Sequence, residues 1–156
     1  MKEANVNRAI IFASLVGILV STYAMYVELV ADLKPGYKAL CDISEHASCS
    51  KVLTSKYAKG LGLVSQDSLF KVPNCVYGII FFCIIIFLST FNKISVVRLL
   101  LCLSAVSLLT CVYLAYLLIF VLRDFCIVCV STYFINAAIA FFLNKKHALL
   151  CAKKSI

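Results

Sequence analysis

Four long segments without a charged residue constrain the fold of this chain more than any other feature. They run from about residue 9 to 27, 72 to 91, 99 to 122 and 125 to 143. Each is close to the roughly 20 residues with which a helix crosses about 30 Å of hydrocarbon. Lipid offers no partner for backbone amides, so each segment is expected to be a helix. The sequence therefore predicts an all-α membrane protein, a bundle of four transmembrane helices.

Composition supports this class. Of the 156 residues, 63% are hydrophobic and 14% are charged, which is more apolar surface than a soluble domain of this size can bury. The net charge is +8, but the basic residues stand singly beside apolar runs, as expected next to lipid headgroups. The expected partner of this surface is a lipid bilayer, and nucleic acid is not expected to bind.

The whole chain, residues 1–156, is predicted to be one membrane domain. Its expected parts are helices at about 9–28, 74–92, 97–122 and 125–143, a long loop at 29–73 and a tail at 144–156. The loop keeps aromatic and aliphatic residues among its turn residues. It is expected to carry a short helix within "SCSKVLTSKYAKGLG", closed by Gly60, and an amphipathic anchor at "SQDSLFKVPN".

Lysine and arginine in the short flanks predict that both termini are cytoplasmic. With that orientation the cytoplasmic side holds Lys2, Arg8, Lys93, Arg98, Lys145, Lys146, Lys153 and Lys154. The final residues, 153–156, resemble the C-terminal di-lysine signal that returns membrane proteins to the endoplasmic reticulum. The expected location is therefore the endoplasmic reticulum membrane, with the long loop in the lumen.

Two pairs of cysteines are expected to meet at the lumenal face. Four spans place the long loop and the turn at 123–124 on the same side of the membrane. The loop carries Cys41 and Cys49, and the start of the fourth helix carries Cys126 and Cys129. A helix start lowers the pKa of a thiol. A thiolate can attack a disulfide sulfur, so electrons could pass from one pair to the other.

Other interpretations of the nine cysteines remain open at this stage. Four cysteines could hold zinc, although structural zinc sites usually show the short spacing in both halves; no metal is expected. The loop pair could be an inert disulfide. Buried cysteines within spans are usually packing residues, which is the expectation for Cys83, Cys102 and Cys111. Cys151 could be free or palmitoylated, and Cys75 is ambiguous.

Polar residues share one face of the predicted fourth helix. Cys126, Cys129, Tyr133 and Asn136 follow helical spacing, and a polar stripe within a span faces the bundle interior. Asn74, at the start of the second helix, is expected at about the depth of Cys129. An amide and a phenol beside a dithiol could bind two carbonyls of a flat lipophilic ring, such as a quinone. Tyr133 could equally belong to the aromatic belt at the membrane interface, and Asn136 is better explained by contact between helices.

The chain resembles the vitamin K epoxide reductase family over nearly its whole length. The resemblance is carried by "ALCDISEHASCS", "GLGLV", "QDS", "PNCVYGIIF" and "VYLAYLLIFVLRDFCIVCVSTY". It implies a four-helix bundle that reduces vitamin K 2,3-epoxide to the quinone and the quinone to the hydroquinone. No tightly bound cofactor is implied. Leu53 and Tyr57 stand where bulkier aromatic residues are expected, and Tyr77 stands where phenylalanine is expected. These differences bear on the shape of the pocket and on coumarin affinity more than on the chemistry.

The resemblance also implies roles for particular residues. Cys126 and Cys129 would be the catalytic pair, with Cys129 on the substrate side. Cys49 would exchange with Cys126, and Cys41 would face a lumenal thioredoxin-fold donor. The implied substrate-binding residues are Asn74, Tyr133, Tyr77 and Leu114. Coumarin inhibitors would occupy the same pocket.

Two rival functions are retained. The same fold could form disulfides in partner proteins with a quinone as electron acceptor. Alternatively, the chain could be a non-enzymatic four-helix scaffold, which predicts that Cys126 and Cys129 are dispensable. The absence of tryptophan, and with it the tryptophan-bearing first-loop signature of claudin-type proteins, counts against the scaffold.

Overall fold

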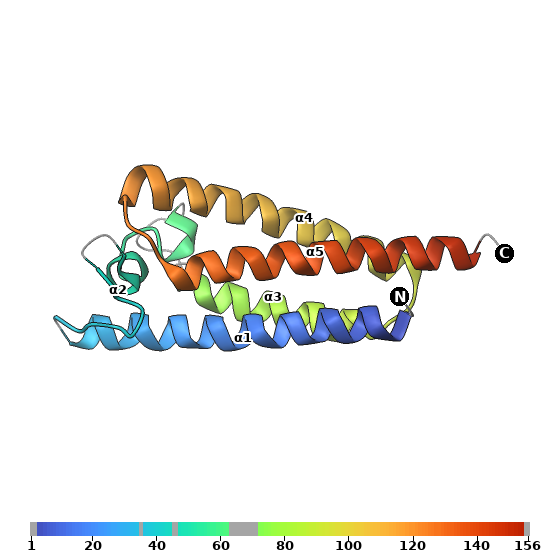
Figure 1. Cartoon of the computed structure of the whole chain (residues 1–156), viewed down its shortest axis with the longest axis horizontal. Coiled ribbons are helices and arrows are strands. Elements are labelled where there is room, and N and C mark those ends of the chain that lie inside the picture. Colours follow the sequence, from blue (N-terminus) through green and yellow to red (C-terminus); the bar gives the residue numbers. More distant parts are fainter. Residues whose placement is uncertain (1–2, 35, 45–46, 63–71, 155–156) are drawn as a thin grey trace.

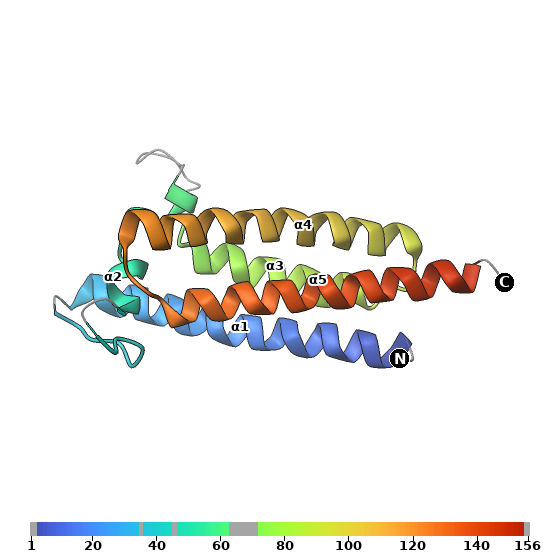
Figure 2. The same cartoon turned by 45° about the horizontal axis from the view of Figure 1, so that its top comes forward.

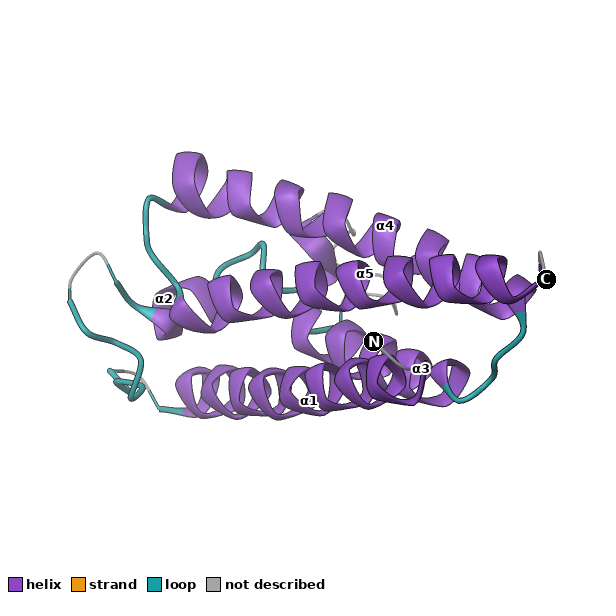
Figure 3. Cartoon of the chain, turned by 45° about the vertical axis from the view of Figure 1, so that its right-hand side comes forward, coloured by secondary structure: helices purple, strands orange, loops and turns teal. Residues whose placement is uncertain are grey.

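A computed structural model of the chain describes residues 3–34, 36–44, 47–62 and 72–154. Helices make up most of these residues (Figure 3). In chain order they are α1 (Glu3–Leu33), α2 (Cys49–Leu53), a 3-10 turn (Gly60–Gly62), α3 (Asn74–Ser89), α4 (Ile94–Tyr116), a π-helical segment (Leu117–Leu122) that continues α4, and α5 (Ile127–Lys154).

The long helices lie side by side in one bundle (Figures 1 and 2). Three stretches of the described chain are long and apolar enough to cross a membrane: α1, α4 with its π-helical continuation, and α5; α3 is a shorter apolar helix. Large apolar side chains on the outside, such as Phe12, Leu109 and Phe134, are each at least 70% exposed, as expected of a surface that faces lipid. The predicted fold class, an all-helical multi-pass membrane protein, is confirmed.

The helices differ in length from the predicted spans. α1 continues to Leu33, and α5 continues to Lys154, so most of the segment predicted as a tail is helical. α3 ends at Ser89. The buried Lys146 ammonium donates to the carbonyls of Ser89 at 2.7 Å and Phe91 at 3.3 Å. The extension of α5 thereby satisfies carbonyls at the end of α3 that the short helix leaves without partners.

The two ends of the bundle are different. Both termini and the connection from α3 to α4 lie at one end, here called the terminal end, whereas α2 and the start of α5 lie at the other, the loop end (Figure 1). One apolar cluster fills the terminal half, around Phe82 and Ile139. A second cluster at the loop end includes Cys49 and Cys126. The loop is therefore packed onto the bundle.

The predicted short helix in the loop is present as α2, but it ends earlier than expected. Ser48 caps its start by accepting from Lys51 N, and the helix ends at Leu53, before the cap residue Thr54. Gly60 does not close this helix. Instead it opens a left-handed turn in which Gly60, Leu61 and Gly62 have φ of 60°, 57° and 70°. Most of the predicted amphipathic anchor falls at 63–71, outside the described residues.

Candidate active site

The four cysteines of the two predicted pairs lie together at the loop end. Cys41 and Cys49 form a disulfide. The sulfur of Cys126 lies 3.8 Å from that of Cys49, and the sulfur of Cys129 lies 2.8 Å from that of Cys126. Cys49 and Cys126 are fully buried, whereas Cys41 and Cys129 are partly exposed. The sulfurs thus form a continuous series from the loop to α5, here called the sulfur relay.

Cys126 is held where its thiolate is stabilised. It is the last residue of the connection that follows Arg123, whose left-handed backbone (φ 52°) turns the chain from the π-helical segment toward α5. The Cys129 thiol donates to the Cys126 sulfur, and the Cys129 backbone amide donates to the same atom at 3.3 Å. These bonds lower the pKa of the Cys126 thiol although its burial acts in the opposite direction. The Cys126 sulfur is therefore suited to thiol–disulfide exchange with the neighbouring Cys49.

Asp42 holds the disulfide-bearing loop in shape. Its carboxylate accepts from Ala39 N at 2.8 Å, from Ser48 Oγ at 3.0 Å, and from both the amide (3.0 Å) and the hydroxyl (2.6 Å) of Ser50. Partial burial raises the pKa of Asp42, but these four bonds outweigh that effect and lower the pKa to about 2. Sequence reasoning missed this residue, although serines on both sides of Cys49 were a signal.

Replacing Asp42 with alanine is expected to loosen α2 and move Cys49 away from Cys126. Turnover driven by a protein reductant should fall by roughly tenfold, since a hydrogen bond to a charged group contributes about 1.5–3 kcal/mol. Turnover driven by a small dithiol that reduces Cys126 and Cys129 directly should change much less. Asp42→Asn, which keeps one acceptor oxygen, should lie between wild type and Asp42→Ala. Equal losses with both reductants would show that Asp42 does not act through the loop.

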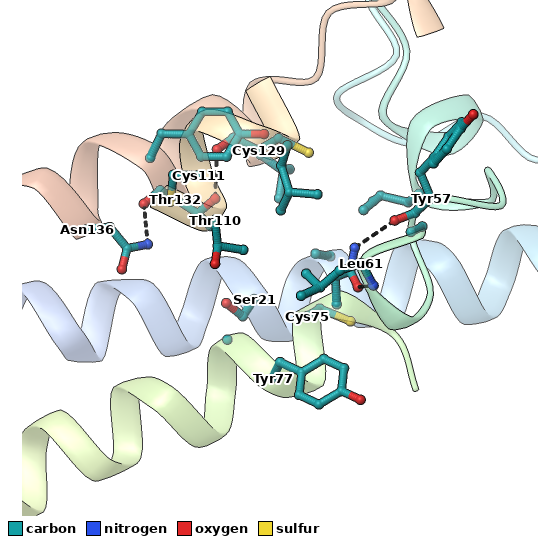
Figure 4. A pocket seen from close by; sticks show the side chains of 18 of the residues that line it. Ser21, Tyr57, Leu61, Cys75, Tyr77, Thr110, Cys111, Cys129, Thr132 and Asn136 are labelled. Atoms are coloured by element: carbon teal, nitrogen blue, oxygen red, sulfur yellow. Dashed lines mark hydrogen bonds between the residues drawn. The ribbon is translucent and has the colours of Figure 1, made fainter. Parts of the chain in front are cut away.

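A cavity of about 380 Å³ lies between the helices beside the sulfur relay, within the range of small-molecule sites. Its walls come from all four long helices and from the loop. Figure 4 shows Cys129 and Thr132 on one side, Cys75 and Tyr77 on another, and Tyr57 and Leu61 on the loop side. Five residues of the predicted site line the cavity: Asn74, Tyr77, Leu114, Cys129 and Tyr133. Of the relay cysteines, Cys129 alone is among the lining residues.

Asn74 has a contact that its sequence context did not predict. Its Oδ1 accepts from Leu61 N, and its Nδ2 donates to Tyr57 O, both at 2.8 Å. The amide therefore fixes the left-handed turn whose Leu61 side chain lines the cavity. These bonds use one of the two hydrogens on Nδ2. Asn74 therefore positions a wall of the cavity.

The other polar residues on α5 have separate surroundings. Tyr133 is half-buried, and its hydroxyl has no hydrogen-bond partner within the described part of the chain. Asn136 accepts from Ser107 of α4 at 2.6 Å and donates to the Thr132 carbonyl at 2.9 Å. The interpretation of Asn136 as a contact between helices is confirmed. Tyr133 keeps a hydroxyl at the cavity wall that can donate to a bound ligand.

Two further groups on the cavity wall were not predicted as site residues. Glu28 of α1 is 1% exposed, and it accepts from the Cys75 thiol at 3.7 Å. At the sequence level Glu28 only marked the end of the first apolar segment.

Among the described residues, no group of three or more histidine, cysteine, aspartate or glutamate side chains is arranged to hold a metal ion.

Together these features define a class of protein. An apolar cavity within the membrane bundle has one thiol of a dithiol pair, Cys129, on its wall, and the other thiol, Cys126, lies 3.8 Å from the Cys49 sulfur of a disulfide. A lipophilic substrate can meet Cys129 there, while a protein outside the membrane can meet the loop pair. These features are those of a membrane thiol oxidoreductase.

Comparison with known proteins gives the family. The sequence profile of the Vitamin K epoxide reductase family matches residues 8–143. The chain is 39% identical over 129 residues to vitamin K epoxide reductase complex subunit 1 of Rattus norvegicus and 38% identical to that of Mus musculus, covering 80% of each chain. The chain belongs to the vitamin K epoxide reductase family, and it is a thiol-dependent membrane oxidoreductase of that family.

Proposed function

We propose that this protein reduces vitamin K 2,3-epoxide to the quinone and the quinone to the hydroquinone. The proposal is supported above all by one observation. The sulfurs of Cys49, Cys126 and Cys129 follow one another at 3.8 and 2.8 Å and end at an apolar cavity. The rat and mouse proteins that the chain resembles are named as subunit 1 of the vitamin K epoxide reductase complex.

Cys126 and Cys129 supply the electrons. The Cys129 thiolate attacks the ring, and the Cys126 thiolate then attacks the Cys129 sulfur and expels the reduced ring. One S–S bond forms, and two electrons and two protons leave the dithiol. Quinone takes up both to become hydroquinone, whereas the epoxide takes them up and releases water to become quinone. No bound cofactor is needed for either balance.

Cys41 and Cys49 restore the catalytic pair. In the reduced loop pair, the Cys49 thiolate attacks Cys126 of the new disulfide, and Cys41 then attacks Cys49, which frees Cys126 and closes the loop disulfide. A lumenal protein of the thioredoxin fold reduces that disulfide through Cys41. The structure, with a closed loop pair and free Cys126 and Cys129, corresponds to the state after this exchange.

Four residues bind the substrate in this proposal. Tyr133 donates from its hydroxyl to a ring oxygen, and Asn74 does the same with its remaining Nδ2 hydrogen. Tyr77 and Leu114 contact the ring and its lipophilic tail. All four line the cavity, and coumarin inhibitors, which share a flat ring with carbonyl oxygens, are expected to compete there.

The proposed location is the endoplasmic reticulum membrane with both termini in the cytoplasm. Both termini lie at the end of the bundle opposite the sulfur relay (Figure 1). The basic flanks at that end favour the cytoplasmic side. The loop end then faces an oxidising lumen, where a disulfide such as Cys41–Cys49 persists.

A disulfide oxidase coupled to quinone is the second candidate. The observation that favours it is the closed Cys41–Cys49 bond next to free Cys126, because a closed loop pair is the form that accepts electrons from a folding protein. The electron path is the same, and the two functions differ in whether the epoxide is a substrate.

The purified protein, assayed with a small dithiol, separates these functions. We expect it to consume both vitamin K 2,3-epoxide and vitamin K quinone, with the products identified by chromatography. Reduction of the quinone alone would favour the disulfide oxidase. Reduction of neither would contradict both functions.

A further inference from the structure

Glu28 is a carboxyl group at the wall of a largely apolar cavity. It lies near the end of α1 and is 1% exposed. One carboxyl oxygen, Oε2, accepts from the Cys75 thiol, while the other, Oε1, has no hydrogen-bond partner among the described residues. An ionisable residue in a membrane helix is costly and marks a functional position more often than a structural one.

Lys59 connects this buried carboxyl group with water. Its ammonium lies 3.9 Å from Glu28 Oε1 and 2.8 Å from Asp32 Oδ2. The Lys59 side chain is 33% exposed and that of Asp32 is 43% exposed, whereas that of Glu28 is 2% exposed. Asp32 holds the ammonium in place and raises the pKa of Lys59. Partly exposed charged side chains thus lead from solvent to Glu28, which itself lines the cavity.

The position of Glu28 is complementary to that of Tyr133. Glu28 lies beside Cys75, and Figure 4 shows Cys75 across the cavity from Cys129 and Thr132 of α5. Tyr133 belongs to the same helix as Cys129. A quinone ring carries its two oxygens on opposite edges, so one can meet the hydroxyl of Tyr133 while the other meets the carboxyl group of Glu28.

We propose that Glu28 is a catalytic proton donor, which protonates the substrate oxygen farther from Tyr133 and recovers its proton from solvent through Lys59. This inference rests on the proposed quinone reduction. Two thiols become one disulfide and release two electrons and two protons. The ring takes up both electrons, one proton from Glu28 and one of the two protons that the thiols release, while the second thiol proton goes to solvent. Glu28 then takes up a proton by way of Lys59, so the overall balance is unchanged.

The test separates the two half-reactions. Enzyme that has been reduced with a dithiol and freed of excess reagent is mixed with a water-soluble 1,4-naphthoquinone, and hydroquinone formation is followed by absorbance. Glu28→Gln keeps the shape and loses the proton, so the rate should fall by roughly 100-fold. The rate at which the dithiol re-reduces the oxidised enzyme should change by less than about twofold. A merely structural defect would instead slow both half-reactions.

Two variants complete the test. Glu3→Gln, the same substitution at the start of α1 and outside the cavity lining, is the matched control and should keep the naphthoquinone rate within about threefold. Glu28→Asp keeps the carboxyl group but shortens the side chain, which moves the acid away from the cavity, so the naphthoquinone rate should fall about tenfold. This variant tests the inference if Glu28→Gln does not accumulate in membranes. A wild-type rate in either Glu28 variant overturns the inference. A wild-type enzyme that reduces no quinone contradicts the proposed function instead.

Discussion

Replacing Cys129 with alanine should abolish turnover of quinone and epoxide with every reductant, by at least about 1,000-fold. Cys129 is the only relay cysteine that lines the cavity, and it is therefore the one that a substrate can contact. Without it, Cys126 still lies 3.8 Å from Cys49 but has no partner with which to close a disulfide. A Cys49–Cys126 bond should therefore accumulate, and it can be identified by mass spectrometry of non-reduced peptides.

Cys111 provides a matched control for this variant. It is also a cavity-lining thiol, but it lies on α4 and is not one of the four cysteines of the sulfur relay. Cys111→Ala should keep activity within about threefold, because it removes one packing sulfur and no electron carrier. A Cys129→Ala enzyme that still turns over would show that another thiol attacks the substrate. Cys75, which also lines the cavity, would then be the first residue to examine.

The sequence was sufficient to predict the bundle and the meeting of the cysteine pairs. Segment length and the absence of charge define a membrane helix almost independently of tertiary structure. An even number of spans between Cys49 and Cys126 then places both at the same end. That inference requires only a count of membrane crossings. The distance of 3.8 Å between the sulfurs of Cys49 and Cys126, in contrast, depends on how α2 packs against α1 and α5.

The parts that could not be predicted depend on the path of the loop. The contacts of Asn74 with Tyr57 and Leu61 require a left-handed turn whose central residue is a leucine, and leucine rarely adopts that conformation. Glu28 and Lys59 are 31 positions apart in sequence, so no local pattern connects them. The extension of α5 to Lys154 likewise depends on the contact of Lys146 with the end of α3. No hydrophobic periodicity in the sequence indicates that contact.

Replacing Cys41 with alanine should separate the two sources of electrons. Cys41 is partly exposed at the outer end of the sulfur relay, so it is the position that a protein reductant can reach. Without Cys41, the loop pair cannot pass electrons inward, and turnover driven by a thioredoxin-fold protein should fall by at least about 100-fold.

A membrane-permeant dithiol should give the opposite result with the same variant. Such a molecule can approach Cys129 through the apolar cavity and reduce the Cys126–Cys129 disulfide directly, so activity should stay within about threefold of wild type. Cys151→Ala, which removes an exposed cysteine from the terminal end, should leave both activities unchanged. If Cys41→Ala instead lost both activities equally, Cys41 would be needed to fold the loop over the cavity. The free-energy difference between the two assays, about 1.4 kcal/mol for each factor of ten, therefore measures how much of the role of Cys41 is electron transfer.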